Sequence, residues 1–136
     1  NAFTSSFPFG GAGIRLSTSA GADVTGSITG NTIDQNDGFG GQGIRLVAGS
    51  PTDSMVLTLS NNAITDAGTA FFFLNHGFMD IDGTGNSALS GGFGFKAYNY
   101  GTGDQYIDMT ATVFSGNTTD ISLTDTGDVQ AVNITP

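Results

Sequence analysis

The chain has 136 residues, with 12 aspartates against three basic residues and a formal net charge of −9. This acidity predicts repulsion from nucleic acid and anionic membranes, and no apolar run approaches the roughly 20 residues of a membrane span. We therefore expect no nucleic-acid partner and no membrane insertion. The chain contains no cysteine, which excludes disulfides, thiol catalysis and thiolate metal sites.

A glycine-rich phrase near the start of the chain returns later with only one residue changed. Phe-Gly-Gly-x-Gly-Ile-Arg-Leu spans residues 9–16 and again residues 39–46, and a repeat of this period is typical of stacked architectures. Fainter copies begin at Ala70, Gly94 and Asp120. In every copy the first and third residues after the start are apolar, so alternation predicts a strand that faces a core. The predicted inward residues are Ile14, Leu16, Ile44, Leu46, Phe71, Phe73, Phe95, Ala97, Ile121 and Leu123.

An asparagine recurs later in four of the copies, at Asn31, Asn62, Asn86 and Asn117. An amide has two donors and a two-lone-pair acceptor, so copies about 4.8 Å apart can bond to the copies above and below. The series predicts a structural asparagine ladder along one corner of the stack.

Each copy then supplies a short strand, a loop, a second strand, an asparagine corner and a third short strand. The 22 glycines oppose helix throughout. We predict an all-β chain wound as a β-solenoid of about five coils, with residues 1–136 forming one domain. Because Asn1 is not a natural start, we interpret the chain as a fragment or subunit of a longer assembly.

These repeats resemble the right-handed parallel β-helix superfamily, which includes pectate lyases, polygalacturonases, phage tailspikes and bacterial surface proteins. The glycine-apolar-x-apolar strand is similar to the first sheet of that fold, and the asparagine series is similar to its corner ladder. The resemblance implies a right-handed parallel β-helix over essentially the whole chain. It is specific for the fold and unspecific for activity.

The three basic residues share one predicted outward column, which reads Arg15, Arg45, Phe72, Lys96 and Ser122. In the superfamily that this chain resembles, the outward face of the first sheet carries the substrate groove, often for acidic polysaccharides. The resemblance therefore makes Arg15, Arg45, Phe72 and Lys96 a candidate glycan groove, with Tyr98, Tyr100 and Tyr106 of the adjoining loop as stacking faces. The alternative is that these cations neutralise aspartates of nearby loops.

The sequence signals for catalysis and for metal binding are weaker than the signal for a glycan groove. The aspartate pair of polygalacturonases is missing from the corresponding strands, so we assign no catalytic residue; an enzyme of this fold would be a polysaccharide lyase or glycoside hydrolase. Turn aspartates are weak calcium candidates, at Asp34, Asp37, Asp80 and Asp82. Asx turns explain them equally well, and we assign no other cofactor.

We therefore expect a non-catalytic extracellular structural or adhesive module that stacks end to end. Its partners would be copies of itself or neighbouring coils of a longer chain, joined through residues 7–16 and 120–134. The rival hypothesis is a cell-surface module that binds or cleaves polysaccharide through the candidate groove.

Overall fold

The computed structural model describes residues 2–4, 11–35 and 40–136, which form fifteen strands and no helix. The described residues thus include no helix that is long and apolar enough to cross a membrane. All strand pairs are parallel, and the strands fall into three sheets of five.

The three sheets are named here A, B and C, in the order in which the chain visits them. Sheet A contains β1 (Ala2–Thr4), β4 (Thr32–Asp34), β7 (Ala63–Thr65), β10 (Ser87–Leu89) and β13 (Val113–Ser115). Sheet B contains β2 (Ala12–Thr18), β5 (Gln42–Ala48), β8 (Thr69–Asn75), β11 (Phe93–Asn99) and β14 (Thr119–Asp125). Sheet C contains β3 (Asp23–Thr29), β6 (Ser54–Ser60), β9 (Phe78–Thr84), β12 (Asp104–Thr110) and β15 (Val129–Ile134).

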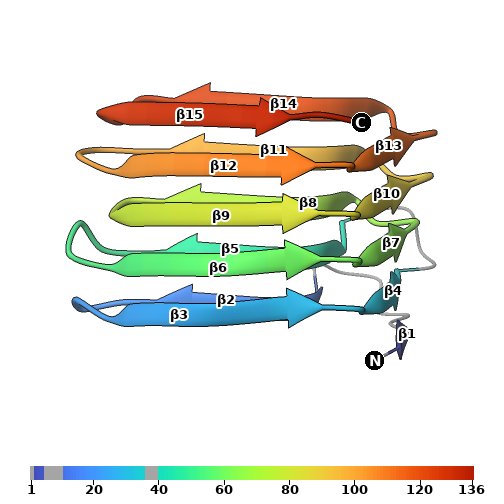
Figure 1. Ribbon diagram of the computed structural model, residues 1–136, viewed down its shortest axis with the longest axis horizontal. Helices are drawn as coiled ribbons and strands as arrows, with labels where there is room; N and C mark the ends of the chain where they lie inside the picture. Colours follow the sequence, from blue (N-terminus) through green and yellow to red (C-terminus); the bar gives the residue numbers. More distant parts are fainter. Residues whose placement is uncertain (1, 5–10, 36–39) are drawn as a thin grey trace.

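The chain passes from A to B to C five times, so the predicted solenoid of about five coils is confirmed. Figure 1 shows the strands of sheet C in front, running left to right, and those of sheet B behind, running right to left. The coils rise from the N-terminus to the C-terminus in the same view, which makes the winding right-handed. Sheets B and C form the two broad sides of a flattened prism, and short sheet A closes one narrow side.

The core lies between the sheets and consists of columns of apolar side chains in register. Ile14, Ile44, Phe71, Phe95 and Ile121 pair from coil to coil, and so do Leu16, Leu46, Phe73, Ala97 and Leu123. Both predicted inward columns are therefore confirmed. In the middle coils these side chains are fully buried, and Phe73 and Phe95 meet edge to face with centroids 5.2 Å apart.

Glycines that open the repeats are required by close packing between sheets B and A. A Cβ added at Gly43 would lie 2.5 Å from Cγ2 of Ile64 and 2.6 Å from the carbonyl oxygen of Ala70. At Gly94 a Cβ would lie 2.5 Å from the Phe114 ring. Such contacts would force the backbone to move, so the repeated glycine keeps the corner tight.

The asparagine ladder occupies the corner between sheets C and A. The Asn31 side chain donates to Oδ1 of Asn62 at 2.9 Å, and the Asn62 side chain donates to Oδ1 of Asn86 at 3.0 Å. All three are buried, and the residue before each has a positive φ, as a sharp corner requires. The structure confirms this part of the predicted ladder.

The fourth predicted member of the ladder is wrong. Thr112 occupies the next rung, because its neighbour Val113 pairs with Ser87 and donates its N–H to the carbonyl of Asn86. Asn117 instead lies at the corner between sheets A and B, where its Oδ1 accepts from the Gly91 N–H at 3.0 Å. Both corners contain a residue with positive φ, and at Gly116 that residue is followed by asparagine, so the same phrase fits either corner.

A second buried ladder, which the sequence analysis did not predict, lies at the end of sheet B opposite sheet A. The Asn75 side chain donates to Oδ1 of Asn99 at 2.9 Å, and the Asn99 side chain donates to Asp125 at 3.2 Å. Both asparagines also donate to backbone carbonyls of the following turn. The sequence signal for this second ladder was an asparagine at the end of the strand in two successive repeats, Asn75 and Asn99.

Asp53 holds the first two turns between sheets B and C together. One carboxylate oxygen accepts backbone N–H groups of Gly21 and Ala22, and the other accepts those of Gly49 and Ser50. Burial acts to raise the pKa of Asp53, but the hydrogen bonds from these turns outweigh it and lower the pKa below its usual value. The carboxylate thus serves as a charged link between adjacent coils.

Candidate functional site

The outward side of sheet B, called here the basic face, brings together the predicted groove residues. The pairing register aligns Arg15, Arg45, Phe72, Lys96 and Ser122 in one column, as the sequence analysis expected. Tyr98 lies in the next outward column, beside Leu74 of β8. Tyr100 follows β11 in the turn toward sheet C.

The cations of the basic face contact aromatic rings. The Arg45 guanidinium carbon lies 4.9 Å from the centre of the Phe72 ring, and the Lys96 ammonium lies 4.4 Å from the centre of the Phe93 ring. Lys96 also lies 5.3 Å from the centre of the Tyr98 ring. A ring face attracts a cation through its quadrupole, by about 0.5–1 kcal/mol where solvent has access.

The rings continue as a connected array across two neighbouring coils, those of β8 and β11. Phe72 and Tyr98 lie 5.7 Å apart, and Tyr98 and Tyr100 stack with their planes only 9° apart. The His76 ring also stacks on Tyr100, with the two ring centroids 5.4 Å apart. His76 and Phe93 were missing from the sequence-predicted set, although His76 directly follows β8 and Phe93 begins β11. Tyr106, which was predicted to join this set, instead lies on β12 of sheet C.

Arg45 is the most confined cation of the face. Its side chain donates from one terminal nitrogen to Oε1 of Gln42 at 3.1 Å, and its Nε is buried without a partner among the described residues. Burial lowers the pKa of Arg45, and the neighbouring charge of Arg15 lowers it further. The guanidinium is therefore partly desolvated and next to a like charge.

No carboxylate balances these cations within the described part of the chain. The outward columns of sheet B contain no aspartate, and among the described residues Arg15, Arg45 and Lys96 contact a hydroxyl, an amide and aromatic rings. The alternative that they neutralise loop aspartates therefore finds no supporting contact among the described residues. The face can attract an anionic surface and stack on flat rings.

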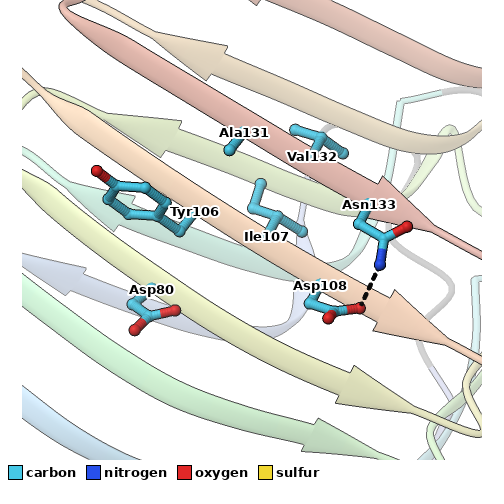
Figure 2. Close-up of a pocket in the computed structure, with 7 residues that line it drawn as sticks. All are labelled: Asp80, Tyr106, Ile107, Asp108, Ala131, Val132 and Asn133. Carbon is cyan, nitrogen blue, oxygen red and sulfur yellow. Dashed lines mark hydrogen bonds between the residues drawn. The ribbon is translucent and has the colours of Figure 1, made fainter.

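The outward side of sheet C, called here the acidic face, has the opposite character. Its outward columns carry Asp23, Asp80, Asp82, Asp104 and Asp108. A shallow hollow of about 270 Å³ lies on this face. Figure 2 shows the side chains of Asp80, Tyr106 and Asp108 along β9 and β12, where they line it. The Asn133 side chain donates to Asp108 at 3.2 Å across the hollow.

The three calcium candidates that the structure describes do not form a common site. Asp80 and Asp82 lie on β9, whereas Asp34 lies on β4 of sheet A. Asp37 lies outside the described residues. Within the described ranges no three acidic or histidine side chains gather as a metal site would need.

The described coils likewise do not place a histidine next to a carboxylate, as a general base and its orienting partner would require. His76 contacts the Tyr100 ring, and none of its described contacts is to a carboxylate that would orient it as a base. The candidate site therefore consists of two broad faces with binding character, and its chemistry is charge and stacking.

Comparison of the chain with protein-family models, with curated proteins and with solved structures found no match. The class of fold to which the chain belongs is therefore defined by its structure alone. The chain is a parallel β-solenoid with a buried asparagine ladder.

Proposed function

We propose that the chain is a non-catalytic structural module of an extracellular surface or filament, and that it extends end to end. In this proposal the last coil of one copy stacks on the first coil of a second copy. The fold would be a member of the right-handed parallel β-helix superfamily, a proposal supported by the parallel coils and the corner ladder.

The observation that carries the proposal is the exposure of core-facing residues at the last coil. Ile121 is 43 % exposed and Leu123 is 47 % exposed, whereas their partners Phe95 and Ala97 in the preceding coil are fully buried. The outer edges of β13, β14 and β15 have no neighbouring strand among the described residues. An apolar end with unpaired backbone groups invites another strand layer.

The first described coil offers a matching surface. Ile14 and Leu16 of β2 are only partly buried, in the same two inward columns as Ile121 and Leu123. Contact between the first coil of one copy and the last coil of another is head to tail along the coil axis, so repeated stacking builds an open filament.

The experiment is sedimentation velocity over a range of concentrations, with electron microscopy of the same samples. The unaltered chain should form growing, regular stacks. The double variant Ile121→Asp/Leu123→Asp should stop this growth, because it places two charges in the stacking surface. The matched control, Ala131→Asp/Asn133→Asp, adds the same charge on outward positions of the same coil and should still stack.

Two outcomes would refute end-to-end stacking. One is a chain that remains monomeric at every concentration. The other is equal association of both double variants, which would show that the last coil does not form the contact.

A further inference from the structure

The two broad sides of the solenoid carry opposite charge, although the whole chain is strongly acidic. All three cations of the chain, Arg15, Arg45 and Lys96, point outward from sheet B. The outward columns of sheet C carry five aspartates and no basic residue. The basic face thus has three positive charges and the acidic face has five negative charges.

Each face also has an apolar centre. On the basic face the Phe72 and Tyr98 rings lie 5.7 Å apart. On the acidic face the Phe78 and Tyr106 rings lie 6.0 Å apart, and their side chains are 37 % and 39 % exposed. Aromatic residues at the middle of a patch with charges around them are typical of protein interfaces.

We propose that the basic face of one copy binds the acidic face of a second copy, side by side. The proposal deepens the proposed function, because it rests on copies that associate and adds a lateral contact to the end-to-end contact. The occupant is a second copy because one chain supplies both complementary surfaces.

The available area is sufficient for a specific contact. Sheet B has five strands of seven residues, which is a face of about 23 Å by about 24 Å. Two such faces would bury about 1,100 Å² in total, slightly above the roughly 1,000 Å² expected of a biological interface. A contact of this size is at the weak end, so salt should affect it strongly.

The proposed lateral pairing can continue from one copy to the next without closing into a dimer. Sheets B and C form opposite sides of the prism, so a copy bound on one side leaves its own second side free (Figure 1). Side-by-side addition would continue copy after copy, at right angles to the stacking direction. End-to-end and lateral contacts together would build a layer.

The test measures lateral association alone, in the Ile121→Asp/Leu123→Asp background, by sedimentation velocity at low and high ionic strength. One partner carries Arg45→Glu/Lys96→Glu, which reverses the basic face. The other carries Asp80→Lys/Asp82→Lys/Asp108→Lys, which changes the acidic face from five negative charges to a net charge of about +1 at three outward positions. Far-UV circular dichroism and thermal unfolding of each variant establish that it is folded.

Each charge-reversed variant alone should associate at least about 100-fold more weakly than the unreversed protein, because like charges then face each other. An equimolar mixture of the two should associate again, since each altered face then meets a face of opposite charge. High ionic strength should weaken association of the unreversed protein. If a single variant fails to fold, Ser27→Lys/Thr58→Lys on the acidic face tests the same contact.

Several results would overturn the proposal. One is association that is the same for the unreversed and both reversed proteins; another is a mixture that stays monomeric although both variants are folded. A third is a protein that never pairs laterally but binds polygalacturonate, with loss of binding in Arg45→Glu/Lys96→Glu. That last result would assign the basic face to a glycan. Failure of end-to-end stacking is separate, because it is measured by the effect of Ile121→Asp/Leu123→Asp on filament length.

Discussion

Replacing Asn62 by alanine should remove a large part of the stability of the solenoid. The Asn62 side chain takes part in four hydrogen bonds and is 1 % exposed. It donates to the carbonyl of Ile28 and to Oδ1 of Asn86, and it accepts from the backbone and side chain of Asn31. Alanine removes all four bonds and leaves buried partners that water cannot reach.

The expected loss is about 4 kcal/mol, at about 1 kcal/mol for each hydrogen bond. A chain of this length is expected to be stable by about 7–20 kcal/mol, so the loss is a sizeable fraction. With a urea dependence of about 2 kcal/mol per molar, the unfolding midpoint should fall by about 2 M. Asn31→Ala should cost about half as much, because the Asn31 side chain makes two hydrogen bonds to described residues, to Asn62 and to the Thr29 carbonyl.

The assay is urea unfolding followed by far-UV circular dichroism. Asn133→Ala is the matched control, because Asn133 is an exposed asparagine with a single side-chain hydrogen bond, to Asp108. Its cost should stay below about 0.5 kcal/mol. The ladder reasoning is refuted if Asn62→Ala lowers the midpoint no more than Asn133→Ala does.

Three further predictions concern other parts of the frame. Because folding lowers the pKa of Asp53, its carboxylate stabilises the fold fully above about pH 4, which is the pKa in the unfolded chain, and this stabilisation is lost as the pH falls through the pKa in the folded chain. Acid unfolding should show this loss. Asp53→Asn should flatten the pH dependence of stability and lower stability at neutral pH. Gly43→Ala should destabilise by about 1–3 kcal/mol in urea unfolding, whereas Gly26→Ala, where an added Cβ makes only ordinary contacts, should be neutral or stabilising by up to about 1 kcal/mol. Thr112→Asn should raise the thermal midpoint, because an amide at this rung can accept from the Asn86 side chain and extend the ladder, worth about 1 kcal/mol; an unchanged or lower midpoint would count against it.

The inward columns could be predicted because period-two alternation is a strong constraint. A strand with one buried face must place apolar residues at every second position, and a slip by one residue would expose them all. Ile14, Ile44 and Phe71 therefore aligned from the sequence as they do in the structure. The outward column of Arg15, Arg45, Phe72 and Lys96 followed from the same alternation.

The corners could not be predicted as well, because their signals are shared. Gly30-Asn31 and Gly116-Asn117 look alike, yet the first turns from sheet C to sheet A and the second from sheet A to sheet B. In the fourth coil Ala111 adopts the positive φ that Gly30, Asn61 and Gly85 adopt in the first three coils, and Thr112 replaces the asparagine. The phrase at residues 116–117 was then the nearest match, and the ladder was assigned to the wrong corner.

The opposite charges of the two faces could be inferred only from the register between coils. The winding places Arg15 beside Arg45 and Asp82 beside Asp108, at about 5 Å between neighbouring strands. Two like charges at that distance repel by about 0.8 kcal/mol even in water, and more where they are partly buried, as the lowered pKa of Arg45 indicates. Repeats that stack similar residues thus build repulsion into each face, and a surface of opposite charge relieves it. A second copy carries that surface on its other side, so the same register that concentrates like charges also supplies their partner.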